Sequence, residues 1–195
     1  MRVAILVYDG FDELDAIGPY EVFQTAGDLG ADVSASLHTV DERERVTASH
    51  GLTIEVDGPL SEVEDETDIV LVPGGGWNQP ATEPGARHEF EDGTIPDLLA
   101  ALGDDTLVVS VCTGAMLLAA GGLLANRPAT THHSAMDDLS VFTTVKEERI
   151  VDDGDVLTAA GVSAGLDLAL YLVRQECEAG IGEAVADEME YQPRV

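Results

Sequence analysis

An apolar run that ends in a cysteine constrains the fold of this chain more than any other feature of its sequence. Residues 107–111 are apolar and mostly β-branched apart from the small residue Ser110, and Cys112-Thr113-Gly114 and an apolar, helix-forming segment follow at once. This order predicts a buried strand, a tight turn that carries one side chain, and a helix that starts behind the turn. Such a strand–turn–helix unit, a nucleophile elbow, is typical of α/β proteins.

Cys112 occupies the turn of this predicted elbow, beside the N-terminus of the following helix. Positive partial charge at a helix N-terminus stabilises anions, so the pattern predicts a thiol with a lowered pKa that is partly thiolate near neutral pH. Ser110 and Gly114 are the small residues that a crowded junction needs. The pattern alone leaves an alternative, because free cysteines often pack as small buried apolar side chains.

Further apolar runs alternate with helical segments along the chain. Strands are predicted at residues 3–8, 33–40, 69–72, 107–111 and 129–131, helices at 19–29, 96–102, 134–139 and 161–173, and hairpins at 46–56 and 150–158. Unbroken apolar strands that alternate with helices predict a mainly parallel sheet covered by helices on both faces. With 195 residues and no long linker, we expect one α/β domain over residues 1–195.

The charge of the chain excludes two classes of partner. Acidic residues number 38 against nine basic ones, which gives a net charge of -29. Nucleic acids and anionic membranes both require basic surface, so neither is expected as a partner. The acids are dispersed and Lys146 is the only lysine, which predicts adaptation to high salt; an acidic protein that binds basic partners is the alternative.

Cysteine usage and the N-terminal segment indicate a cytoplasmic protein. Cys112 and Cys177 are the only cysteines, so no disulfide framework is expected. Acidic residues interrupt the N-terminal apolar run too early for a signal peptide, and no apolar stretch approaches the ~20 residues that span a bilayer. Because the phosphate-binding glycine motifs and His-Glu-x-x-His are both absent, we expect no cofactor and no metal ion.

Backbone N–H groups near Cys112 are candidates for binding developing negative charge. Gly74-Gly75-Gly76 follows a predicted strand directly, and the carboxyl ends of parallel strands meet at the ligand-binding edge of such sheets. The N–H groups of Gly75 and of Thr113, the residue after the cysteine, are therefore predicted donors. A plain turn after a strand is the alternative for the glycines.

Asp15 is the candidate acid–base residue. It follows the first strand between the apolar residues Leu14 and Ile17, and partial burial would raise its pKa into the range useful for proton transfer. The alternative is a capping or turn residue ahead of the helix. His132 and His133 are neighbours that cannot point the same way, so a shared metal is not expected; either could approach Cys112, and a surface role is open for His133.

Four motifs of the chain together resemble the ThiJ/PfpI superfamily, which shares the flavodoxin-like fold of class I glutamine amidotransferases. The resemblance runs from Arg2 to about Val173 and rests on Leu14-Asp15-x-x-Gly18-Pro19-x-Glu21-Val22-Phe23, Val72-Pro73-Gly74-Gly75-Gly76, Ser110-Val111-Cys112-Thr113-Gly114 and Ala129-Thr130-Thr131-His132. It implies a flavodoxin-like three-layer α/β/α sandwich. It also implies a homodimer, which is common in the superfamily.

The resemblance also implies a function. Cys-Thr-Gly with Ala-Thr-Thr-His is similar to isonitrile hydratases and to the sensor domains of AraC-type regulators, whose further helix-turn-helix domain this sequence lacks. It implies that Cys112 is the nucleophile toward a small electrophilic substrate and Asp15 its acid–base partner, where other branches carry glutamate. The peptidase branch has histidine directly after the cysteine, and this chain has Thr113, so peptidase activity is not expected.

Two alternatives to isonitrile hydration stay open at the level of sequence. The first is cofactor-free glyoxalase or deglycase action, in which the thiolate adds to an aldehyde; its acid–base residue is usually glutamate rather than an aspartate such as Asp15. The second is a redox sensor or stress chaperone that uses Cys112 as an oxidisable thiol.

Overall fold

The computed structural model describes residues 1–195 and has one seven-stranded sheet at its centre. The strands are β1 (Arg2–Leu6), β2 (Ser34–Thr39), β5 (Gly58–Pro59), β6 (Ile69–Val72), β7 (Leu107–Val111), β10 (Ile150–Asp152) and β11 (Val156–Ala159). Their spatial order is β10-β11-β7-β6-β1-β2-β5. Every neighbouring pair is parallel except β10 with β11, which forms the predicted hairpin.

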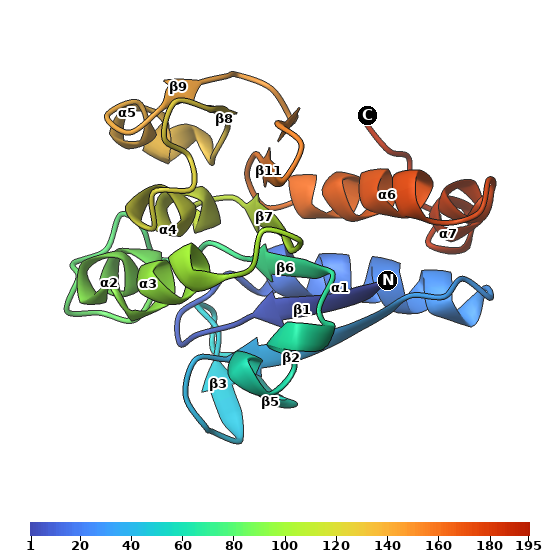
Figure 1. Ribbon diagram of the computed structural model, residues 1–195, viewed down its shortest axis with the longest axis horizontal. Coiled ribbons are helices and arrows are strands. Elements are labelled where there is room, and N and C mark those ends of the chain that lie inside the picture. The colour runs from blue at the N-terminus through green and yellow to red at the C-terminus, as the bar shows by residue number, and fades with distance from the viewer.

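Helices cover both faces of this sheet (Figure 1). On one face α1 (Glu13–Asp28), α6 (Ala164–Glu176) and α7 (Ile181–Glu188) pack on one another. On the other face α2 (Ala86–Asp92), α3 (Thr94–Ala101) and α4 (Gly114–Ala120) form the second helical layer. The predicted flavodoxin-like three-layer sandwich with a mainly parallel sheet is confirmed.

Small elements complete the fold. The predicted hairpin is formed by β3 (Arg45–Thr47) and β4 (Thr53–Glu55), and β8 (Pro128–Ala129) pairs with β9 (Thr144–Val145) beside α5 (Met136–Leu139). Short 3-10 turns cover Leu60–Glu62, Glu64–Glu66 and His133–Ala135. None of the helices combines the length and the apolar character needed to cross a membrane.

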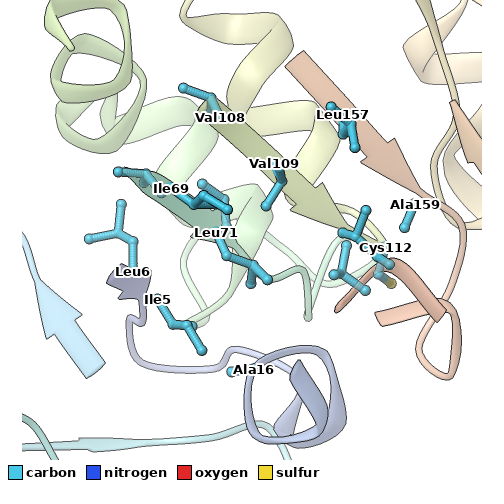
Figure 2. Close-up of a cluster of buried hydrophobic side chains, with 14 of the residues drawn as sticks. Ile5, Leu6, Ala16, Ile69, Leu71, Val108, Val109, Cys112, Leu157 and Ala159 are labelled. Atoms are coloured by element: carbon cyan, nitrogen blue, oxygen red, sulfur yellow. The ribbon is translucent and has the colours of Figure 1, made fainter. Parts of the chain in front are cut away.

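The core runs through the central strands to the cysteine. All four residues of β6 are buried, because helices cover both faces of this strand. This is why β6 contains no polar residue. Figure 2 shows apolar side chains of the central strands, among them Leu71 and Val109, with the Cys112 sulfur at the end of the row. Cys112 is therefore part of the buried core.

The first helix begins earlier than predicted, at Glu13 rather than at Pro19. Asp12 caps it, because its side chain accepts the Leu14 N–H at 3.2 Å. Proline is favoured in the first turn of helices, which is why the sequence pattern suggested a start at Pro19, but this helix contains the proline in its interior. Asp15 consequently lies in the first helical turn and not in a loop.

Candidate active site

Cys112 lies in a strained turn directly after β7. Its φ is 58°, a left-handed conformation that is uncommon for a residue other than glycine. The Cys112 N–H donates to the carbonyl oxygens of Ala159 at 3.1 Å and Ala160 at 3.0 Å, and the Thr131 hydroxyl donates to the Cys112 carbonyl at 2.8 Å. These contacts hold the turn in its strained shape, as expected of a nucleophile elbow.

Glycines allow the elbow and the loop after β6 to approach closely. A Cβ atom on Gly74 would lie 2.4 Å from the Thr113 backbone nitrogen, and one on Gly114 would lie 2.1 Å from the Val72 carbonyl oxygen. Side chains at these two positions would separate the strand ends that form the site. Of the small residues predicted at the junction, Gly114 is therefore required by backbone contact.

Asp15 is a buried carboxyl group with one free oxygen. The Gly74 N–H donates to its Oδ2 at 3.0 Å, whereas Oδ1 has no hydrogen-bond partner although the residue is fully buried. Burial, together with the negative charge of Asp12, raises the pKa of Asp15 to about 7, against opposing effects of the Gly74 N–H and of Cys112. The predicted raised pKa of Asp15 is confirmed, and its value suits proton transfer near neutral pH.

The prediction of a lowered pKa for Cys112 is wrong. The residue is only 6% exposed, and burial followed by the charge of Asp15 raises the pKa of the thiol to about 12. The N–H groups of Val162 and Thr113 oppose this shift by hydrogen bonding to the sulfur. Desolvation outweighs these dipoles, so at neutral pH the cysteine is a protonated thiol.

The two predicted N–H donors differ in what they contact. The Thr113 N–H faces the Cys112 sulfur, as the elbow geometry requires. The Gly75 N–H instead donates to the Thr113 hydroxyl at 3.0 Å, so it is not free to bind a substrate atom. Val162, for which the sequence predicted no role, supplies the second N–H beside the sulfur, because only the folded backbone brings it there.

His132 forms part of the wall of the site but does not hydrogen-bond to Cys112. Its Nδ1 accepts the Ser134 N–H at 3.2 Å and lies 2.8 Å from the Ser134 hydroxyl, so the proton of the neutral ring belongs on Nε2. Burial and the neighbouring His133 lower the pKa of His132. The ring is therefore neutral at pH 7 and can donate, rather than supply charge.

Two neighbouring cavities lie at this edge of the sheet, one of them at the cysteine. A cavity of about 260 Å³ contains Cys112, Thr113 and Gly75 in its lining. A wider one of about 640 Å³ is lined in part by Met136, Arg149 and Ala160. Both cavities include His132 and Val162 in their walls, so these two residues lie between them.

Near the entrance, Asp12, Glu13 and His50 place one ligand atom each within 4.8 Å of one another. All three already have structural roles. Asp12 caps α1, and Glu13 accepts the His50 N–H at 2.7 Å and lies 2.6 Å from His50 Nδ1. These contacts account for the group without a metal ion.

Comparison with known proteins agrees with this geometry. Residues 1–175 match the model of the DJ-1/PfpI family. An isonitrile hydratase from Pseudomonas putida is 30% identical over 197 residues, which cover 99% of this chain and 79% of the hydratase. A deglycase from Thermococcus kodakarensis is 30% identical over 146 residues, 71% of this chain and 76% of the deglycase.

Solved structures of similar proteins have the same fold. A ThiJ/PfpI family protein from Pseudomonas syringae superposes with a TM-score of 0.83 at 29% identity, covering 100% of this chain and 76% of the other. DJ-1beta from Drosophila melanogaster gives a TM-score of 0.83 at 21% identity and covers 98% of both chains. The second similarity concerns the fold alone.

Proposed function

The chain belongs to the DJ-1/PfpI family, and on this basis we propose that it is a cysteine-dependent enzyme that hydrates an isonitrile to an N-substituted formamide. One observation carries the proposal. Asp15 keeps a free carboxylate oxygen and a pKa of about 7 close to the Cys112 thiol, at the end of a cavity. A thiol and a base of this kind are what addition to a small electrophile requires. The similarity to the Pseudomonas putida hydratase favours an isonitrile as the electrophile.

The first half of the reaction joins the sulfur to the substrate. As the Cys112 sulfur attacks the terminal isonitrile carbon, Asp15 takes the thiol proton and returns it to that same carbon. The product is a thioimidate, in which the carbon carries the sulfur, one hydrogen and a double bond to nitrogen. Proton removal during attack is needed because the free thiol has a pKa of about 12.

The second half of the reaction releases the formamide. Water adds to the thioimidate carbon, one of its protons goes to the substrate nitrogen, and the carbon–sulfur bond breaks. The other proton returns to the Cys112 sulfur by way of Asp15. The N–H groups of Val162 and Thr113 stabilise the departing thiolate, and the neutral His132 ring is positioned to donate toward substrate in the cavity.

The site favours this chemistry over oxidation sensing and proteolysis. Sensor cysteines are accessible and have low pKa values, whereas Cys112 is buried with a raised pKa. A peptidase needs a base beside the cysteine that can also protonate an amine, and Thr113 stands where the peptidase branch has histidine. His132, the nearest histidine in the lining, makes its hydrogen bonds to Ser134.

A deglycase or glyoxalase activity is the second candidate, supported by the 30% identity to the Thermococcus deglycase. The same thiol and carboxyl pair could form a hemithioacetal with an aldehyde and then move a proton between neighbouring carbons. The two activities differ in product, since methylglyoxal would yield lactate and an isonitrile a formamide.

The deciding experiment uses both substrate classes. Purified protein in molar potassium chloride is incubated with a panel of isonitriles, with methylglyoxal and with peptides, and products are identified by proton NMR. We expect formamide from wild type and from Cys177→Ser, a control at a cysteine outside the site, but none from Cys112→Ser. Lactate without formamide would favour the second candidate, and formamide formation by Cys112→Ser at the wild-type rate would refute the proposal.

A further inference from the structure

Val162, which precedes α6, is a second residue of the site with a strained backbone. Its φ is 38°, a conformation that β-branched residues rarely adopt. Val162 lines the same cavity as Cys112, and the carbonyl oxygen of Ala160, two residues earlier in the turn, accepts the Cys112 N–H at 3.0 Å. The Val162 N–H lowers the pKa of the thiol, so the strain lies beside the sulfur. Strained conformations persist only where neighbouring contacts enforce them. The contacts of this turn therefore identify residues that control the thiol.

Arg149 contacts this turn on both sides of Val162. Its carbonyl oxygen accepts the Ala160 N–H at 2.9 Å, and its guanidinium donates to the Ser163 hydroxyl at 3.3 Å. The same guanidinium donates through Nε to Asp167 Oδ2 on the first turn of α6. One residue thus ties together the segment before Val162, the segment after it and the helix that follows.

Asp167 fixes the position of the Arg149 guanidinium. It is fully buried, and its other oxygen accepts the Tyr191 hydroxyl at 3.2 Å and the Arg194 N–H at 2.9 Å. A fully hydrogen-bonded, buried carboxylate fixes its arginine far better than an exposed partner would. The planar guanidinium also presents several donors in a fixed arrangement that lysine cannot reproduce.

We propose that Arg149, anchored by Asp167, is a positioning residue that holds the Val162 N–H against the Cys112 sulfur. The inference rests on the proposed function only in taking Cys112 as the reacting group. Neither Arg149 nor Asp167 hydrogen-bonds to the cysteine, so their effect reaches the sulfur through the backbone of the turn.

The test measures the thiol itself rather than turnover. Iodoacetamide reacts with thiolate, so its rate at a fixed pH follows the fraction of thiolate at Cys112. The measurement is made in an Asp15→Asn, Cys177→Ser background, because removing the Asp15 charge lowers the pKa of Cys112 toward an accessible range and leaves one reactive cysteine. The pH profile of alkylation then gives the pKa directly.

In this background we expect Arg149→Lys, which keeps the charge but loses the fixed donor arrangement, to raise the pKa of Cys112 by about one unit and to slow alkylation about tenfold. Arg127→Lys is the matched control. Arg127 also forms an arginine–aspartate pair, with Asp155, but at the opposite end of β7 from the cysteine. The control is expected to titrate like the parent.

Ser163→Ala covers the case in which Arg149→Lys fails to fold. It removes one exposed hydroxyl and leaves the Arg149–Asp167 pair intact, and we expect about threefold slower alkylation. A parent-like profile in the folded Arg149→Lys protein, an equal shift in Arg127→Lys, or a parent-like Ser163→Ala where the lysine variant is unfolded would overturn the inference. A protein inactive on every isonitrile but with the expected shift would refute the proposed function and leave this inference standing.

Discussion

Asp15 and Cys112 are buried neighbours, and each shifts the pKa of the other. The charge of Asp15 raises the pKa of the thiol, while Cys112 lowers the pKa of the carboxyl group that burial raises. The free Oδ1 of Asp15 has no other protein group to bind. The pair therefore holds protons as a unit, and a single proton can pass between sulfur and carboxylate while a substrate reacts.

The pH dependence of activity should follow Asp15. Its carboxylate form is the base, so kcat/KM is expected to rise with pH through about 7 and then to level off. Asp15→Asn keeps an acceptor for the Gly74 N–H but cannot take a proton, and should lower kcat about 100-fold or more. Initial rates of formamide formation from pH 5 to 9 measure both effects. A variant with the wild-type rate and profile would assign proton transfer to another group.

Stability should also depend on the charge of Asp15. Its pKa is about 7 in the folded protein against an ordinary 3.8, so between these values only the folded state keeps the proton and stability falls as pH rises. The Asp15→Asn variant has no titratable group at this position, so its stability does not fall with pH in this way. Between pH 5 and pH 8 we expect its free energy of unfolding to gain about 3 kcal/mol relative to wild type. Urea melts of both proteins test this, and a difference that does not change with pH would contradict it.

The glycine loop should tolerate no side chain at Gly74. The added Cβ would lie 2.4 Å from the Thr113 nitrogen, a backbone atom that can move only with the elbow. We expect Gly74→Ala to cost about 2 kcal/mol of unfolding free energy and to reduce activity. Gly103→Ala is the control, since a Cβ there has no neighbour within 4 Å. Equal stability of the two variants would show that the junction is less tightly packed than described.

High salt should stabilise the protein. The net charge of -29 produces repulsion that screening reduces, and the Debye length falls from about 10 Å at 0.1 M to about 3 Å at 1 M salt. We therefore expect a higher Tm in molar potassium chloride than in dilute buffer. Sucrose of equal osmolality, which does not screen charge, should raise Tm less. A higher Tm in dilute buffer would refute adaptation to salt.

The fold was predictable where burial leaves a clear pattern of residue types. The strands β6 and β7 are covered on both faces, so they are apolar except for Ser110 in β7, and their bounds were predicted correctly. Helix α2 was not predicted, because it is short and polar and buries only Ala86 completely. The start of α1 was misplaced because proline is favoured in the first turn of helices, whereas Pro19 lies in the interior of this one.

From the sequence, Asp15, Cys112 and the Thr113 N–H were predicted as candidates for the site, but the Val162 N–H was not. Asp15 and Cys112 were identified as candidates because a carboxyl group can transfer protons and a thiol can act as a nucleophile. The N–H of Val162 carries no such signal, and its position depends on a turn that Arg149 holds from a distant segment. The predicted shift of the Cys112 pKa had the wrong direction, because the sequence shows the helix behind the thiol but not how deeply the thiol is buried.

The positive φ of Cys112 has a consequence for how this protein can evolve. Glycine adopts a φ of 58° without steric penalty, so mutation of the cysteine to glycine would relieve the backbone. Genetic drift constrained only by folding would therefore tend to replace this residue. A lineage that no longer needed the thiol would therefore be expected to lose the cysteine early.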